Sequence, residues 1–222
     1  KFYKLNDKNV GQKSENKIEK LSKLLKKDKI DLQFISATEN IAWLLNLRGL
    51  DSKYSPLPNS YLIVDNKKKV NFFCNLKKID KKLIKKLGKN INVLNINNIS
   101  FFIKEIKNKK IQIDRSTCSI FFKNILKENN SIIEKTDSIY LMKSMKNEVE
   151  IKNIIKAHIY DGAALTKFLL WLNDKFKKRK ITEIGAQEKL LKFRKMNKTF
   201  KSLSFPTISG SGPNGAIIHY KA

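Results

Sequence analysis

The stretch SYLIVDNKKKVNFFCN, residues 60–75, decides the fold class. It holds two short runs rich in β-branched, apolar and aromatic residues, Ser60 to Asp65 and Val70 to Asn75, joined by a polar turn that begins at Asp65-Asn66. Such runs on either side of a short turn predict a β-hairpin. The two runs are therefore expected to be neighbouring strands of one sheet.

Helical and extended patterns alternate on both sides of this hairpin. Before it, an apolar stripe that starts at Ser14 predicts a helix, and the alternation at 30–34 predicts a strand. Ser36 and Glu39 fit a capping box for a short helix that closes near Gly49. After the hairpin we expect helices near 79–87, 98–108 and 117–127 and strands at 91–96, 110–114 and 131–135. The alternation predicts an α/β fold with a largely parallel or mixed sheet flanked by helices.

The sequence is expected to form two domains. We expect a tail or linker at 1–12, an α/β domain over 13–140, and a second domain from 144 to 222 that is incomplete. The chain lacks an initiator Met and stops at Ala222 directly after the run AIIHY, so both ends are expected to be cut.

The second domain is expected to begin with two helices and a hairpin. Asn147 is a good N-cap with Glu150 at the third helical position, and apolar residues then recur on one face as far as Leu172. We expect that face to pack against another element. Thr182 can cap a second helix. The segment FPTISGSGPNGAIIHY, residues 205–220, predicts a strand, a Gly-rich turn and a second strand.

The formal charge of +27 raises the question of a nucleic-acid or anionic-membrane partner. Only four of the 47 basic residues are arginines, and the 43 lysines recur on the predicted solvent faces of successive helices instead of forming one stripe. This distribution favours a solvated surface over a nucleic-acid role. No apolar stretch approaches the ~20 residues of a membrane span, and the start lacks a secretory signal, so we expect no membrane partner and a cytoplasmic location.

Few side chains have a pattern that indicates chemistry. Cys74 and Cys118 lack metal-type spacing and indicate structural thiols in a reducing compartment. His158 lies on the predicted packed face of a helix and is expected to be structural. A solitary His219 beside two isoleucines is, on pattern alone, more often a core or surface residue than a catalytic one. Arg48 precedes an irregular loop, and stabilisation of a helix C-terminus explains it most simply.

Three blocks carry a resemblance to a known family: IAWLLNLRGLDSKYSPLPNSYLIV (41–64), KNEVEIKNIIKAHIYDGAALTKFLLWLN (146–173) and LSFPTISGSGPNGAIIHY (203–220). Read together they resemble aminopeptidase P, the Xaa-Pro aminopeptidases of the pita-bread metallopeptidase superfamily. The resemblance covers nearly the whole chain from about Ser14. It implies a creatinase-like α/β domain followed by the start of an α+β pita-bread catalytic domain.

The resemblance also implies an activity and a site. Enzymes of this family use two divalent metal ions, commonly manganese, to cleave the peptide bond before a proline, so peptides with penultimate proline are the implied substrates and a homodimer the implied assembly. It gives His219 a role in contacting the substrate and stabilising the tetrahedral intermediate. Arg48, which lies in the first of the three blocks, is a further candidate for substrate binding. The family's five metal ligands, two Asp, one His and two Glu, follow the HY block. None can be assigned in this chain, which is therefore expected to be inactive by itself.

Two alternatives stay open on the sequence alone. One is a prolidase or creatinase-like relative with a different substrate. The other is a non-catalytic module in which a creatinase-like domain and a lysine-rich surface serve binding or assembly.

Overall fold

The computed structural model describes residues 1–178 and 180–221. The chain divides into two compact units, Lys1–Glu150 and Ile151–Ala222, which we describe separately. In the described ranges no helix is both long and apolar enough to cross a membrane.

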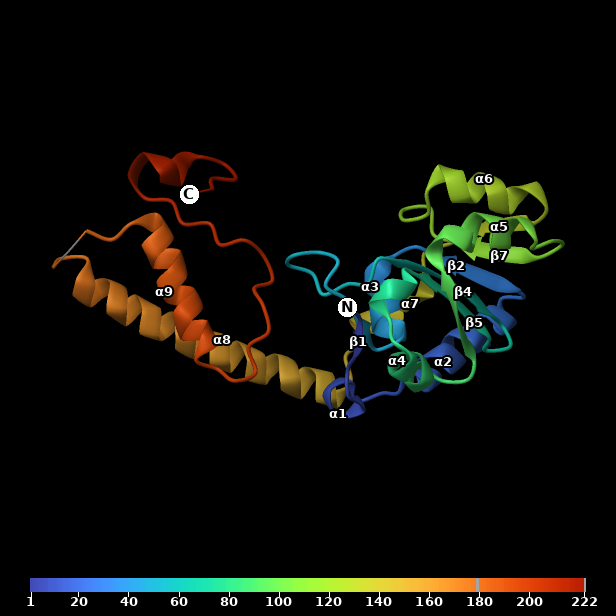
Figure 1. The fold of residues 1–222 in the computed structure, drawn as a ribbon, viewed down its shortest axis with the longest axis horizontal. Helices are drawn as coiled ribbons and strands as arrows, with labels where there is room; N and C mark the ends of the chain where they lie inside the picture. Colours follow the sequence, from blue (N-terminus) through green and yellow to red (C-terminus); the bar gives the residue numbers. More distant parts are fainter. Residues whose placement is uncertain (179, 222) are drawn as a thin grey trace. The chain divides into compact units, whose positions relative to one another are not determined.

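Unit 1 is built on a six-stranded mixed sheet, as the sequence predicted, with strand order β6-β5-β4-β2-β7-β8 (Figure 1). The predicted hairpin is present: β4 and β5 pair antiparallel, with Ser60 opposite Cys74 and Val64 opposite Val70. β2 pairs antiparallel with β4, whereas the outer pairs β5–β6, β2–β7 and β7–β8 are parallel. The strands are β2 (Leu32–Ile35), β4 (Ser60–Asp65), β5 (Val70–Cys74), β6 (Ile91–Asn95), β7 (Lys110–Ile113) and β8 (Ser131–Glu134).

Helices cover both faces of this sheet (Figure 1). Because successive strand residues point to opposite faces, Leu62 and Val64 join one core cluster and Ile63 joins another. The first cluster contains residues of α2, α3, α4 and α7, and the second contains residues of α5 and α6. The helices of unit 1 are α1 (Asp7–Val10), α2 (Ser14–Lys27), α3 (Thr38–Leu44), α4 (Lys81–Leu87), α5 (Ile99–Lys104), α6 (Ile120–Glu128) and α7 (Ser138–Ser144), with 3-10 turns η1 (Leu76–Lys78) and η2 (Ile96–Asn98).

Residues 1–12, which the sequence suggests to be a tail or linker, are part of the compact unit. Strand β1 (Tyr3–Lys4) pairs antiparallel with β3 (Leu47–Arg48), and Phe2 is buried in the first core cluster. The boundary between the two units falls at Glu150, ten residues beyond the predicted end of the α/β domain. The local sequence did not indicate that residues 1–12 belong to unit 1, because a two-residue strand such as β1 shows no periodicity.

The capping box predicted at Ser36 and Glu39 does not form. Helix α3 starts at Thr38 after Ala37, whose side chain makes no capping hydrogen bond. The Ser36 hydroxyl donates to Thr117 Oγ1 at 3.3 Å, and the Glu39 carboxylate accepts from the Tyr140 hydroxyl at 2.8 Å. Tertiary hydrogen bonds have replaced the local pattern here.

The second predicted N-terminus is confirmed in detail. Asn147 Oδ1 accepts from the Glu150 backbone N–H at 3.0 Å, and Glu150 Oε2 accepts from the Asn147 N–H at 2.9 Å. This reciprocal capping box starts α8 (Glu148–Lys175).

Unit 2 consists of the body of α8, a second helix and an irregular C-terminal segment. Thr182 caps α9 (Glu183–Lys195) as predicted, accepting from the Gly185 N–H at 3.0 Å. The expected hairpin over 205–220 is wrong, because the described residues of this segment form a 3-10 turn, η3 (Gly212–Ala216), and no strand. A two-stranded hairpin is marginal without further strands or a helix to pack on, and Ile217 and Ile218 stay exposed.

The apolar face of α8 also differs from expectation. The sequence predicts that this face packs on a neighbour, yet Ile154, Ile155, Leu165 and Leu169 are all exposed, and Ala164 is the one buried residue recorded for the helix. Helix α9 and a 3-10 turn do not provide enough apolar surface to cover the 28 residues of α8.

Candidate functional site

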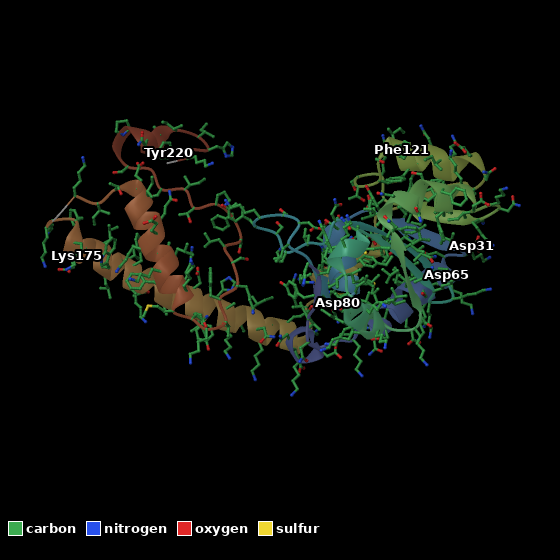
Figure 2. The ribbon with its side chains drawn as sticks, viewed as in Figure 1. Asp31, Asp65, Asp80, Phe121, Lys175 and Tyr220 are labelled. Carbon is green, nitrogen blue, oxygen red and sulfur yellow. The ribbon has the colours of Figure 1, made fainter. Side chains whose placement is uncertain are left out.

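The segment around His219 is held by one carboxylate at the start of α9. Glu183 accepts from the Ser211 N–H at 2.6 Å, from Asn214 Nδ2 at 3.2 Å and from the Tyr220 hydroxyl at 2.7 Å. The hydrogen bond from Tyr220 lowers the pKa of Glu183, and the same bond raises the pKa of the Tyr220 phenol. Glu183 therefore ties the Gly-rich turn and the HY dipeptide together. Figure 2 labels Tyr220 in this C-terminal segment. The sequence analysis did not single out Glu183, because its partners lie 28 to 37 residues away.

His219 lies next to this network on an exposed turn. Its φ of 55° is in the left-handed region that non-glycine residues seldom adopt. The structure thus places the histidine at the surface of unit 2, not on the strand that the sequence predicted. An exposed imidazole is sterically able to meet a ligand.

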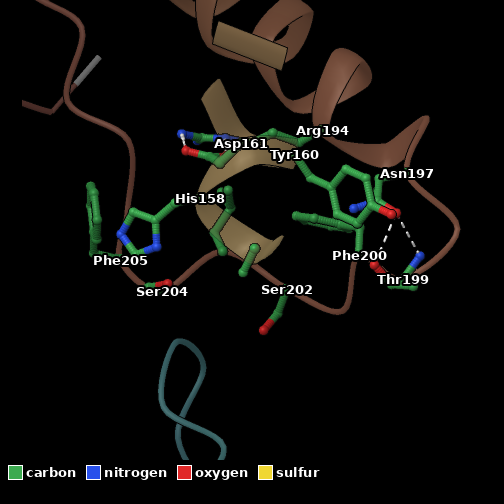
Figure 3. A pocket seen from close by; sticks show the side chains of 12 residues that line it. His158, Tyr160, Asp161, Arg194, Asn197, Thr199, Phe200, Ser202, Ser204 and Phe205 are labelled. Carbon is green, nitrogen blue, oxygen red and sulfur yellow. Dashed lines mark hydrogen bonds and ion pairs between the residues drawn. The ribbon is translucent and has the colours of Figure 1, made fainter. Parts of the chain in front are cut away.

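A cavity of about 450 Å³ lies along the first half of α8 (Figure 3). Its walls come from α8, from the end of α9 and from the segment that follows, and they include His158, Asp161, Arg194, Phe200 and Phe205. Arg194 makes a two-pronged ion pair with Asp161, with Nε–Oδ1 and Nη2–Oδ2 distances of 2.7 and 3.1 Å. A fork of this type neutralises both charges, so the wall of the cavity carries no free carboxylate or guanidinium at this point.

His158 is exposed and lines this cavity, although the sequence places it on a packed face. Its Nδ1–H donates to the Ile154 carbonyl at 2.9 Å, which leaves Nε2 as the acceptor nitrogen. The bond is to the residue one turn earlier on its own helix. The expectation that His158 packs against another element is therefore wrong, and its hydrogen bond is local to its own helix.

Metal ligation needs several carboxylate, imidazole or thiolate groups around one point. Across residues 1–178 and 180–221, no group of three or more His, Cys, Asp or Glu side chains is positioned to hold a metal ion. The residues present therefore do not fit a dinuclear centre, and no chemical step through metal ions can be derived for this part of the chain.

Arg48 belongs to unit 1 and is occupied by backbone contacts. Its Nη1 donates to the carbonyls of Ala42 and Leu47, both at 2.9 Å, and burial lowers its pKa. Ala42 lies in the last turn of α3, where unpaired carbonyls carry partial negative charge. The structure thus provides the helix-terminal contact that the sequence favoured for Arg48.

The two cysteines are free thiols. Burial raises the pKa of Cys74 to about 12 and that of Cys118 to about 11. Since the thiolate is the reactive form, neither residue is suited to act as a nucleophile or a metal ligand near neutral pH.

The mixed six-stranded sheet with helices on both faces, followed by a long capped helix that opens a second unit, defines a two-domain α/β protein of the creatinase and prolidase class. Residues 1–150 match the Creatinase/Prolidase N-terminal domain family, and the chain belongs to this family. Residues 152–222 match metallopeptidase family M24. The resemblance to Xaa-Pro aminopeptidases seen in the three sequence blocks is thereby confirmed at the level of both domains.

Named relatives point in the same direction. The chain is 38% identical over 224 aligned residues to Xaa-Pro aminopeptidase 1 of Dictyostelium discoideum, an alignment that covers 98% of this chain and 35% of that protein. It is 35% identical over 201 residues to Xaa-Pro aminopeptidase ApepP of Drosophila melanogaster, covering 88% of this chain and 33% of that one. The chain thus spans about a third of the length of these relatives.

The fold also matches a solved structure. The X-prolyl aminopeptidase of Caenorhabditis elegans, described as a cytosolic enzyme with a di-nuclear active site, superposes with a TM-score of 0.90 at 27% identity. The match covers 99% of this chain and 37% of the C. elegans chain. A dipeptidase of Bacillus anthracis gives a TM-score of 0.61 at 16% identity, which indicates a shared fold.

Proposed function

We propose that these 222 residues are a fragment of an Xaa-Pro aminopeptidase, a metalloaminopeptidase that removes the N-terminal residue from peptides with proline in second position. The observation that carries this proposal is the 38% identity to the Dictyostelium enzyme across 98% of the chain. In the proposed parent, two metal ions, manganese in our proposal, would supply Lewis-acid activation of a water molecule and of the scissile carbonyl. The fragment alone is proposed to be inactive.

We assign to His219 the role of contacting the substrate near the scissile bond. An imidazole donor aimed at the developing oxyanion stabilises the tetrahedral intermediate more than the ground state, which raises kcat. The exposed position of His219 and its tethering through Tyr220 and Glu183 support this assignment. Arg48 is the second substrate-binding residue in this proposal, and its Nη1 also donates to two backbone carbonyls.

The test uses a longer polypeptide that carries these residues together with the remainder of an M24 domain. We expect it, loaded with Mn²⁺, to release the first residue from a Xaa-Pro-Xaa tripeptide but not from a matched Xaa-Ala-Xaa tripeptide. His219→Ala should lower kcat by about 10²–10³ with unchanged metal content. His158→Ala serves as the matched control because His158 bonds only its own helix. Equal turnover by the His219→Ala variant would contradict the proposed role.

Location and assembly belong to the same proposal. The C. elegans relative is described as cytosolic, and we propose a cytoplasmic location and a homodimer for the parent protein. Peptide substrates are the proposed partners of the parent, and nucleic acid and membranes are not. A salt titration of any nucleic-acid binding tests the last point, since phosphate-driven binding weakens steeply with ionic strength.

A second candidate is a non-catalytic creatinase-like binding or assembly module. The observation that favours it is the lack of a metal-ligand group in the described ranges. The two candidates differ in the longer polypeptide: an enzyme would bind two equivalents of metal and cleave the tripeptide, whereas a binding module would do neither. A prolidase-type relative would instead prefer the dipeptide Xaa-Pro over the tripeptide.

A further inference from the structure

Helix α2 carries one lysine that is not on the solvated surface. Lys17 is 1% exposed, and among the described residues it is the one lysine that is fully buried. Burying a cation is costly unless the protein supplies acceptors and compensating charge. We therefore expect the ammonium group of Lys17 to have hydrogen-bond acceptors and a compensating negative charge nearby.

The ammonium group of Lys17 is bound at the end of α3. Its Nζ donates to the Trp43 carbonyl at 2.9 Å and to Asn46 Oδ1 at 2.7 Å, and it lies 3.9 Å from the centre of the Trp43 ring. The Trp43 carbonyl is in the last turn of α3, where the helix dipole is negative. A desolvated cation over an indole face adds further attraction.

The same indole connects this cation to the start of α8. Trp43 Nε1 donates to Glu150 Oε1 at 3.2 Å, while Glu150 Oε2 accepts the Asn147 N–H of the capping box. Asn147 Nδ2 in turn donates to the Val10 carbonyl at 2.8 Å. The first turn of α8 is thus tied to α1 and α3 through side chains, not only through the chain itself.

Charges on three elements act on Lys17. Burial lowers the pKa of Lys17 to about 8, against the attraction of Glu150 and Asp7 and with the added repulsion of Arg48. A lysine in this range changes its charge within one or two pH units of neutrality. The proton can leave without loss of the packing, because a neutral amine still donates to the two oxygens that bind it.

We propose that Lys17, Trp43 and Glu150 form a charge-dependent clasp. The clasp holds the first turn of α8 against α3 within unit 1. With Lys17 protonated, the cation attracts Glu150 directly and polarises the indole, whose N–H then donates more strongly to the carboxylate. Loss of the Lys17 proton removes both effects. The first turn of α8 then loosens while the rest of unit 1 stays folded. This inference does not depend on the proposed peptidase function.

Fluorescence of Trp43 provides the test in the full 222-residue chain. The chain has two tryptophans, so Trp171→Phe leaves Trp43 as the sole reporter. We expect its emission to change between about pH 6.5 and about pH 9.5 with a midpoint near 8. Lys17→Met and Lys17→Arg should each abolish this transition, and Glu150→Gln should move it to lower pH. Lys20→Met, an exposed change on the same helix, should leave it in place.

Hydrogen exchange of the Glu150 amide tests whether deprotonation of Lys17 loosens the first turn of α8. After correction for the intrinsic rate, this amide should exchange about three- to tenfold faster at pH 9 than at pH 7 in the parent chain. In Lys17→Arg, which keeps its charge, the protection should not change with pH. Flat Trp43 emission across the range, or equal loss of protection in Lys17→Arg, would overturn the clasp. The Glu150→Gln and Lys17→Arg arms decide the question even if Lys17→Met does not fold.

Discussion

The Tyr220 hydroxyl donates a 2.7 Å hydrogen bond to the Glu183 carboxylate, and this bond links the end of the described chain to the first residue of α9. The same carboxylate accepts from the backbone of Ser211 and the side chain of Asn214. One acidic side chain thus organises the Gly-rich segment that carries His219.

Removing this acceptor should free the segment without unfolding the protein. We expect Glu183→Ala to speed the exchange of the Ser211 amide about tenfold, because that N–H loses a charged acceptor. Tyr220→Phe should have a smaller effect, since Glu183 keeps its other donors. Glu188→Ala, an exposed change on the same helix, is the control. Equal exchange rates in Glu183→Ala and the parent chain would show that Glu183 does not hold the segment.

A buried carboxylate in unit 1 should matter far more for stability. Asp137 accepts from Gln33 Nε2 at 2.8 Å, from Asn40 Nδ2 at 2.7 Å and from the Ile139 N–H at 2.9 Å. Asp137→Ala leaves all three donors buried without this acceptor, and we expect it to lower the free energy of unfolding by about 2–4 kcal/mol.

Urea denaturation measures this cost, and a helix cap provides the comparison. Asp80 accepts only from the Leu83 N–H at 2.7 Å at the exposed start of α4. Asp80→Ala should therefore cost about 1 kcal/mol. If the two substitutions cost the same, the buried network around Asp137 contributes no more than an ordinary cap.

The buried Lys17 gives the stability of the chain a defined pH dependence. Its pKa is about 8 when folded and 10.5 as an ordinary lysine, so between these values the unfolded chain binds more protons than the folded one. Below about pH 8 the folded chain bears the full cost of burying the charged ammonium group. The free energy of unfolding therefore rises as the pH increases from about 8 to 10.5. We therefore expect the free energy of unfolding of the parent chain to increase relative to Lys17→Met between pH 8 and pH 10. A difference that stays constant over this window would contradict the assignment.

The two thiols should react slowly and unequally. With pKa values of about 12 for buried Cys74 and about 11 for half-buried Cys118, little thiolate exists at pH 8. We expect one slow reaction with a thiol reagent in the native chain, removed by Cys118→Ser, and a second only after denaturation. Rapid labelling of Cys74 in the native state would contradict its burial.

The periodicity of apolar residues predicted the strands and helices of unit 1, because these elements bury their apolar faces against one another. Leu62, Ile63 and Val64 alternate between the two core clusters, so the pattern in the chain is the pattern of burial. The capping box at Asn147 and Glu150 was predictable for the same reason: both of its hydrogen bonds are local. The box at Ser36 failed because its groups found partners more than 80 residues away.

The site could be predicted only through the resemblance to a family. No local pattern links Glu183 to Tyr220 or Lys17 to Trp43, since these contacts join residues 26 to 37 positions apart. The predicted strands at 205–220 depended on a sheet that the described residues of unit 2 do not contain. His219 and Arg48 therefore keep their catalytic and substrate-binding assignments as proposals.

The most direct test of the central claim is a side-by-side peptidase assay on a Xaa-Pro-Xaa tripeptide in the presence of Mn²⁺. The purified 222-residue chain is compared with a longer polypeptide that adds the remainder of an M24 domain. We expect release of the first residue by the longer polypeptide and none by the 222-residue chain. Cleavage by the 222-residue chain alone, or failure of the metal-loaded longer polypeptide to cleave, would contradict it.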